Sequence, residues 1–200
     1  RWQVVLSLSN FPLVNLIGFN TAIKAFDRSG HWQLALYTLK LLPLAGFQPD
    51  LVTYGSVMNA LAAGGRWHDV GRLLEVMFTD RLDPDLLCFT SFLKACGQAK
   101  KWMKAMEMLD AMFEAKVLPD HFAYSSAITT CGSPQWLVAL SLFHSTSLPD
   151  VAVFNAMLTP LSRHWKMAMH LLQHMPKMRV KSDEITRTLA SESYSQGTQW

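Results

Sequence analysis

The sequence predicts an all-α fold, an α-solenoid of stacked antiparallel helix–turn–helix repeats that form a right-handed superhelix. Three recurring markers support this prediction. A tryptophan returns at intervals of 30, 35, 35, 34 and 29 residues, at Trp2, Trp32, Trp67, Trp102, Trp136 and Trp165. Another aromatic residue precedes most of them by 11 to 13 positions, at Phe19, Tyr54, Phe89, Tyr124 and Phe154. An aspartate follows, usually after proline, at Asp50, Asp85, Asp120, Asp150 and Asp183. A period near 35 residues is typical of repeat proteins in which each copy packs on the next.

The aspartate marker divides the chain into copies. If it is the last residue of each copy, the full copies are 16–50, 51–85, 86–120, 121–150 and 151–183. Residues 1–15 are then the tail of a preceding copy, and residues 184–200 begin a further copy and form a C-terminal tail. The copy 121–150 is shorter than the others, so we expect a less even C-terminal half.

Each copy contains two apolar runs with helical spacing, separated by a turn. In the first copy, Phe19, Ile23 and Phe26 step by three and four, and a break at Ser29-Gly30 follows. Gly64-Gly65 and Gly132-Ser133-Pro134 are the corresponding breaks in the second and fourth copies.

The second helix of each copy begins at its tryptophan. In the third copy the apolar residues Trp102, Ala105, Leu109 and Met112 share one face. Proline ends this helix, and the aspartate after it can cap the first helix of the next copy. Pro43 and Pro160 fall inside expected helices, where we expect kinks.

Composition excludes several classes of protein. Half of the residues are hydrophobic and 16% are charged, which indicates a folded chain. No uninterrupted apolar stretch is long enough for a membrane span, so we expect no membrane partner. We expect Cys88, Cys96 and Cys131 to be small buried hydrophobes, because no two of them form a Cys-x-x-Cys pair. The chain begins inside a repeat phrase, so we expect it to be a piece of a longer protein, in which any targeting peptide would lie upstream of Arg1.

Catalysis finds little support in the residues. His170 and His174 have the spacing of metal ligands on one helix face, but no third ligand is evident near them. We expect no metal, no cofactor and no enzymatic activity in this stretch.

The phrase Leu51-Val-Thr-Tyr-Gly-Ser-Val-Met-Asn-Ala-Leu, which ends in Pro84-Asp85, resembles the pentatricopeptide repeat, as does Val151-Ala-Val-Phe-Asn-Ala-Met-Leu. The resemblance covers about residues 16 to 190. The related tetratricopeptide repeat places its tryptophan early in the first helix, whereas here it opens the second.

The resemblance implies sequence-specific binding of single-stranded RNA in a mitochondrion or plastid, with one base per repeat. It implies that the fifth and last residues of each copy choose the base and that the second residue packs on it. The fifth residues are Asn20, Gly55, Thr90, Ser125 and Asn155, and the last are Asp50, Asp85, Asp120, Asp150 and Asp183. The second residues are Ile17, Val52, Leu87, Phe122 and Ala152. By resemblance, the target from 5′ to 3′ is uracil, any base, guanine, guanine and uracil.

The distribution of charged residues is compatible with RNA binding but does not by itself indicate it. The first helices of copies two to five contain no Asp or Glu, and Lys24, Arg28 and Lys94 are the main candidates to contact phosphate. With so few cations we expect a shallow salt dependence.

Other interpretations stay open. The aspartates could serve only as caps, and Asn20 and Asn155 could be polar residues on a solvated face. The tryptophans are expected in the core and not on the RNA face. The same groove could bind a protein in a helical scaffold, including other RNA-processing proteins, or the stretch could be the RNA-binding arm of an enzyme.

Overall fold

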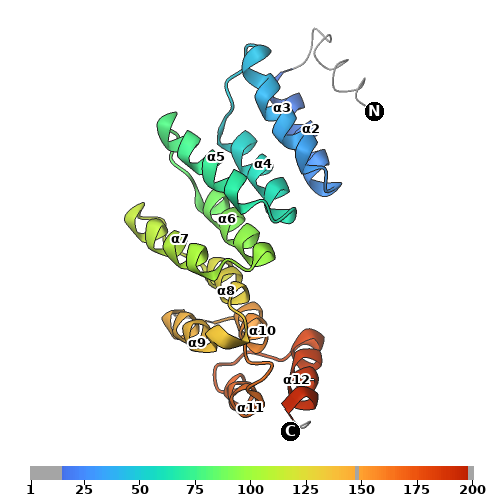
Figure 1. Cartoon of the computed structure of the whole chain (residues 1–200), viewed down its shortest axis with the longest axis vertical. Helices are drawn as coiled ribbons and strands as arrows, with labels where there is room; N and C mark the ends of the chain where they lie inside the picture. The colour runs from blue at the N-terminus through green and yellow to red at the C-terminus, as the bar shows by residue number, and fades with distance from the viewer. Residues whose placement is uncertain (1–14, 147–148, 198–200) are drawn as a thin grey trace. The chain divides into compact units, whose positions relative to one another are not determined.

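The computed structural model describes residues 15–146 and 149–197, and in these residues it is entirely helical. The predicted all-α repeat fold is confirmed (Figure 1). The helices are α2 (Leu16–Arg28), α3 (Trp32–Leu44), α4 (Leu51–Ala63), α5 (Trp67–Thr79), α6 (Leu86–Ala99), α7 (Trp102–Glu114), α8 (His121–Thr130), α9 (Trp136–Ser145), α10 (Val151–Leu158), α11 (Trp165–His174) and α12 (Glu184–Gly197), with a short 3-10 helix at Ser133–Gln135. Trp2, Trp200 and nearly all of the tail 1–15 lie outside the described residues.

The chain forms two compact units, one ending at Gln98 and one beginning at Ala99. In the first unit α2 packs against both α3 and α4, and α4 packs against α5. In the second, α10 packs against α8 and α12. Within each unit, therefore, the first helices of successive copies lie side by side, which is the arrangement a repeat array requires (Figure 1).

The first helices begin where the aspartates cap them. The side chains of Asp50, Asp120 and Asp150 accept hydrogen bonds from the backbone N–H three residues later, at 2.8, 2.8 and 3.0 Å. Asp85 and Asp183 do the same. The predicted capping role is confirmed, because each bond satisfies an N–H group that has no partner inside the helix.

The helices end in turns that require left-handed backbone. Gly30, Gly46 and Gly65 have positive φ, and so do four cationic residues: Arg81 (56°), Lys100 (52°), Lys116 (59°) and Arg179 (60°). After six of these seven positions, the backbone N–H of the next residue donates to the carbonyl five residues earlier, as from Leu82 N to Met77 O, 2.9 Å, and from Val117 N to Met112 O, 2.9 Å. This pattern is the Schellman motif, in which glycine is preferred.

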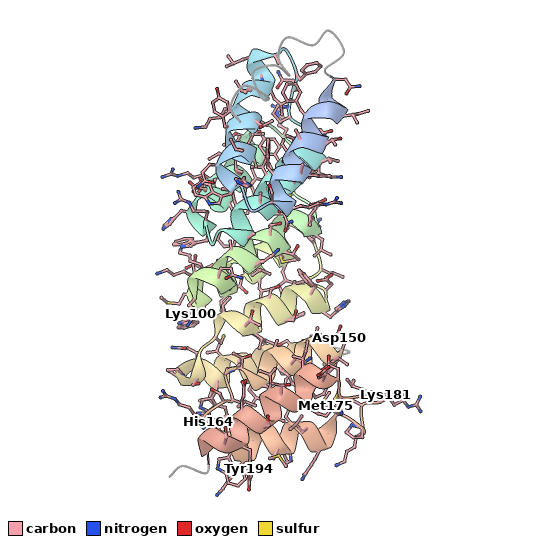
Figure 2. The ribbon with its side chains drawn as sticks, turned by 90° about the vertical axis from the view of Figure 1, so that its right-hand side faces the viewer. Lys100, Asp150, His164, Met175, Lys181 and Tyr194 are labelled. Carbon is pink, nitrogen blue, oxygen red and sulfur yellow. The ribbon has the colours of Figure 1, made fainter. Side chains whose placement is uncertain are left out.

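The turns between the two helices of a copy lie at one edge of the hairpins, and the aspartate caps lie at the opposite edge. In the second compact unit, Lys100 and His164 lie at the edge with the turns inside copies, whereas Asp150 and Lys181 lie at the other edge (Figure 2). The cap edge therefore carries the aspartates together with the beginnings of the first helices.

The tryptophans are not core residues. Trp32, Trp67, Trp102, Trp136 and Trp165 are all half-buried, which corrects the expectation from sequence. Trp32 covers the turn of the next copy: a Cβ on Gly64 would lie 2.8 Å from its Cδ1, and the Arg66 guanidinium lies 4.6 Å from its ring centre. The Trp32 ring thus joins the first copy to the second at the turn edge, and the Trp136 ring, 4.9 Å from that of His164, joins the fourth copy to the fifth.

The core consists of aliphatic, methionine and phenylalanine side chains with the three cysteines, all of which are buried. Pro160 does not kink a helix, because α10 ends before it at Leu158; Pro43 lies in the last turn of α3. Among the described residues, no helix is long and apolar enough to cross a membrane. In the same residues no group of three His, Cys, Asp or Glu side chains is placed to hold a metal ion.

Candidate nucleic-acid interface

Asn20, Asp50 and Thr53 form a hydrogen-bonded cluster between α2 and α4. Asn20 Nδ2 donates to Asp50 Oδ1 at 3.3 Å, and Thr53 Oγ1 lies 2.6 Å from Asn20 Oδ1 and 2.7 Å from Asp50 Oδ1. Thr53 Oγ1 also accepts the Asp50 backbone N–H at 3.3 Å. The hydroxyl has one hydrogen, so it donates to one of the two oxygens at a time. Because a carboxylate only accepts, the amide nitrogen of Asn20 must face Asp50.

The same cluster recurs in the second compact unit with Asn155, Asp183 and Thr186. Asn155 Nδ2 lies 3.2 and 3.3 Å from the two carboxylate oxygens of Asp183. Thr186 Oγ1 lies 2.7 Å from Asn155 Oδ1 and 2.7 Å from Asp183 Oδ1. Thus the fifth residue of one copy, its last residue and the third residue of the next copy act together at both places.

Both aspartates are held in their charged form. Desolvation raises the pKa of Asp50, but hydrogen bonds from Thr53 and Asn20 outweigh it and lower the pKa below its usual value. Hydrogen bonds from Thr186, then Asn155, lower the pKa of Asp183. A charged carboxylate keeps accepting from the amide, so the orientation of each asparagine persists at neutral pH.

The threonines of these clusters were missed by sequence reasoning, although a signal exists. Asp50 and Asp183 are followed three residues later by threonine, whereas Asp85, Asp120 and Asp150 are followed by Cys, Ala and Val. The two copies that are followed by this threonine are the two with asparagine at their own fifth position.

The other fifth residues have less to offer a ligand. Thr90 and Ser125 are buried, 5% and 9% exposed, and each hydroxyl donates to a backbone carbonyl of its own helix. Gly55 has no side chain, and a Cβ there would lie 3.2 Å from Cδ2 of Leu87. Leu87 therefore occupies the space that a fifth-residue side chain would enter.

The remaining aspartates serve mainly as caps. Besides its capping bond, Asp150 Oδ2 lies 3.6 Å from Nε2 of His121, the first residue of the same copy. Thr90 and Asp120 are the fifth and last residues of the same copy, but Thr90 belongs to the first compact unit and Asp120 to the second.

Each compact unit exposes large apolar side chains next to the aspartate caps. The second residues Ile17, Val52, Leu87 and Phe122 are 73%, 49%, 53% and 50% exposed. Ile185, the second residue of the copy that begins at Glu184, is 61% exposed and was not among the predicted residues. Large apolar side chains exposed at equivalent positions are unusual for a solvated surface and indicate a contact face.

In the second compact unit the two kinds of residue line one hollow of about 380 Å³. It lies between α8, α10 and α12, and its lining includes Asn155 and Ala152 from α10 and Ile185 from α12. Ser125 also lines it. Because Ala152 is small, the hollow is open between the second residues of two successive copies.

The predicted phosphate-contacting cations differ in how they are held. Lys24 and Arg28 are exposed on α2. Lys94 is half-buried and donates to Asn59 Oδ1 at 3.3 Å, and Asn59 Nδ2 in turn donates to Asp27 Oδ2 at 2.6 Å. Of these three cations, Lys94 is the one that a hydrogen bond holds in place within the described residues.

Comparison with known proteins identifies the repeats. A family model for the pentatricopeptide repeat domain matches residues 13–66 and 72–134, and a model for the PPR repeat matches residues 52–82. No curated protein sequence matches the chain significantly.

Solved structures share the fold. The pentatricopeptide repeat protein PPR10 in complex with an 18-nt psaJ RNA element has a TM-score of 0.65 at 22% identity over 99% of this chain. This chain spans only 37% of that protein. PPR10 from maize gives a TM-score of 0.59 at 17% identity, with 98% of this chain and 34% of that chain covered. The PPR domain of Arabidopsis thaliana protein-only RNase P 1, in complex with tRNA, gives 0.69 at 14% identity, with 88% of this chain and 96% of that chain covered.

Proposed function

Because the chain belongs to the pentatricopeptide repeat family, we propose that it binds single-stranded RNA and reads one base per repeat. We propose that it serves RNA processing or stability in a mitochondrion or plastid, beside other RNA-processing proteins, and performs no catalytic step itself. Two of the structures that share its fold, PPR10 and the protein-only RNase P domain, are bound to RNA, which supports the proposal.

The observation that carries the proposal is the fixed amide at Asn20 and Asn155. Each amide uses one N–H on an aspartate and one oxygen lone pair near a threonine hydroxyl. One N–H and one oxygen lone pair remain free on each amide. Uracil offers carbonyl acceptors and an N3–H donor, so each free group has a partner of the matching type.

The exposed second residues supply the other half of a base site. A base in the hollow beside Asn155 would pack between Ala152 and Ile185 with its edge toward the amide. Packing of this kind contributes about 1–3 kcal/mol per base when the partner is aromatic, and less for aliphatic groups. Stacking and hydrogen bonding together favour single-stranded RNA, whose bases are free to enter such sites.

The intervening copies fit the rest of the proposed target. Leu87 fills the space above Gly55, so the second copy accepts any base. The short hydroxyls of Thr90 and Ser125 leave room for a larger purine. The target is therefore proposed as uracil, any base, guanine, guanine and uracil.

Replacement of Asn20 by alanine tests the proposal. Loss of both hydrogen bonds to uracil costs about 1–3 kcal/mol, so binding should weaken roughly 5- to 150-fold. Fluorescence anisotropy with a labelled U-A-G-G-U oligomer measures this, and an oligomer beginning with C measures the preference for uracil.

Gln33→Ala is the matched control, because it removes an exposed amide from the second helix α3. It should bind both oligomers as the unchanged protein does. If Asn20→Ala bound both oligomers as tightly as the unchanged protein, the assignment of Asn20 as a base-reading residue would be wrong.

A further inference from the structure

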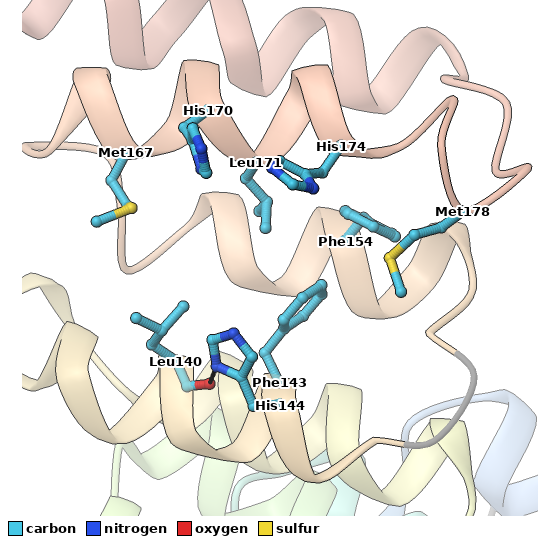
Figure 3. Close-up of a pocket in the computed structure, with 9 residues that line it drawn as sticks. All are labelled: Leu140, Phe143, His144, Phe154, Met167, His170, Leu171, His174 and Met178. Carbon is cyan, nitrogen blue, oxygen red and sulfur yellow. Dashed lines mark hydrogen bonds between the residues drawn. The ribbon is translucent and has the colours of Figure 1, made fainter.

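The second compact unit has a cleft on the side of its second helices, formed by α9, α10 and α11 (Figure 3). Its volume is about 370 Å³, at the lower end of the range of roughly 300–1,000 Å³ for small-molecule and side-chain pockets. Phe143, Phe154 and Leu171 are buried and form its floor. The two phenylalanine rings meet edge to face, with centroids 5.1 Å apart. The floor is thus a preformed aromatic surface.

The rim provides sulfur atoms and one oriented imidazole. Met167 and Met178 line the opening, and Met178 is 48% exposed. Methionine sulfur contacts aromatic ring edges favourably. His144 Nδ1 lies 2.9 Å from the Leu140 carbonyl, so Nδ1 carries the hydrogen and Nε2 of the neutral ring accepts. A phenol O–H or an indole N–H is the donor that such a rim matches.

The surroundings of the cleft are positively charged. Helices α9, α10 and α11 contain no Asp or Glu, whereas the corresponding second helices α5 and α7 contain five. Residues 151–182 contain five cations and no acid: Arg163, Lys166, Lys177, Arg179 and Lys181. Desolvation, Lys177 and His170 together lower the pKa of His174 at the rim, so Lys177 is close to the cleft. A partner with carboxylates beside its apolar group would be attracted here.

We propose that this cleft binds an acidic segment of a partner protein, which places a tyrosine or tryptophan side chain on the floor formed by Phe143 and Phe154, beside Met178. Six of the nine lining residues are hydrocarbon or thioether side chains, and the other three are His144, His170 and His174. The lining favours an apolar protein side chain over RNA, because its hydrocarbon and thioether floor offers few partners to the hydrogen-bonding edges of a base. Tyrosine and tryptophan are the residues that most often anchor protein interfaces. The cleft and the hollow beside Asn155 both include residues of α10, but they have no lining residue in common. The two ligands can therefore be tested with separate variants.

The test uses the whole chain labelled with ¹³C at its methionine methyls, with Met167 and Met178 assigned by Met→Leu variants. The probe is a short helical peptide with one central tryptophan flanked by glutamates. Ring-current shifts should appear at Met167 and Met178 and be absent at Met58 and Met112, which are fully buried elsewhere. Replacing the tryptophan of the peptide by alanine, or its glutamates by lysines, should weaken binding about tenfold or more, the loss typical of an interface hot spot.

Protein variants separate the contributions of the rim. His144→Phe keeps an aromatic ring but removes the acceptor, so binding of the tryptophan peptide should fall several-fold. Lys177→Glu should also weaken it, whereas Lys40→Glu, at an exposed site on α3, should not. These three side chains are exposed, so the variants should fold normally.

Three results would overturn the proposal. They are the absence of shifts at Met167 and Met178 up to the solubility limit of the peptide, equal binding of the alanine peptide, and displacement of the peptide by a U-A-G-G-U oligomer. The last result would assign the cleft to nucleic acid. None of them depends on whether the Asn20 and Asn155 clusters read RNA.

Discussion

Replacement of Thr186 by valine isolates the role of the threonine that joins one copy to the next. Valine has nearly the same shape, so the packing of this buried position, 1% exposed, is kept. The hydroxyl that lies 2.7 Å from both Asn155 Oδ1 and Asp183 Oδ1 is lost. The backbone N–H of Asp183, 3.3 Å away, loses its acceptor as well. Asn155 then keeps its bond to Asp183 but can rotate about it.

The expected size follows from these contacts. A typical hydrogen bond contributes about 0.5–1.5 kcal/mol net, so the preference for uracil at the last base should fall about two- to twelvefold. Loss of the reciprocal cap should cost roughly 1 kcal/mol of stability, or about 2–4 °C in Tm for a chain of this size.

Anisotropy titrations with U-A-G-G-U and U-A-G-G-C oligomers measure the preference, and thermal unfolding measures the stability. Thr188→Val is the matched control, because its hydroxyl bonds instead to the Glu184 carbonyl on the same helix. It should leave the ratio of the two affinities unchanged. A Thr186→Val protein with a lowered Tm and an unchanged ratio would show that Thr186 only caps α12, and the reasoning would be refuted.

Three further predictions concern stability. Gly64→Ala would place a Cβ 2.8 Å from Trp32 Cδ1, and overpacking of this kind costs about 1–3 kcal/mol; thermal unfolding should show a lower Tm than for Gly18→Ala, whose Cβ meets nothing closer than 3.6 Å. Lys116→Gly should raise the Tm, because the left-handed backbone conformation of a residue with a side chain costs roughly 1–2 kcal/mol. The greater freedom of glycine in the unfolded chain offsets part of this gain. A lower Tm would mean that the contacts of the lysine outweigh the strain. Because the pKa of Asp50 is lowered in the folded protein, its charged carboxylate contributes to the free energy of unfolding above the unfolded-state pKa of about 3.9, and this contribution is lost as pH falls through the folded-state pKa. The Tm should therefore fall more steeply on acidification below about pH 5 than in Asp50→Asn, and parallel curves would contradict this.

The repeat architecture was predictable because the markers are local. Proline followed by aspartate specifies a helix end and the next cap from a few adjacent residues, and α4, α8 and α10 begin directly after Asp50, Asp120 and Asp150. The exposure of Ile17, Val52 and other second residues also follows from their place next to the cap.

Features that depend on contacts between copies were harder to predict. The half-buried state of Trp32 depends on how closely the turn at Gly64 approaches, which spacing along the chain does not specify. The role of Thr53 depends on an asparagine 33 residues earlier. Its signal is that an asparagine at the fifth position of a copy occurs together with a threonine at the third position of the next copy. This pairing occurs only twice in the sequence, so it becomes evident only once the structure shows the contact.

The cationic residues with left-handed backbone and the apolar cleft were missed for two different reasons. Arg81, Lys100, Lys116 and Arg179 stand where glycine is usual, so turn signals based on glycine miss these turns. The cleft depends on how Phe143 and Phe154, from different copies, meet between the short helices α9 and α10. Periodicity identifies both residues as apolar but not the space that they leave open.

The bonds from Asn20 to Asp50 and Thr53 set where the protein can be cut and rejoined. A segment transplanted as residues 16–50 would leave its recognition group without the threonine that completes it. A recombinant array built from this chain should instead be spliced after the first turn of the following helix, past residue 53. Each transferred segment then contains the asparagine, the aspartate and the threonine of its cluster, and the recipient protein supplies only the residues after the threonine.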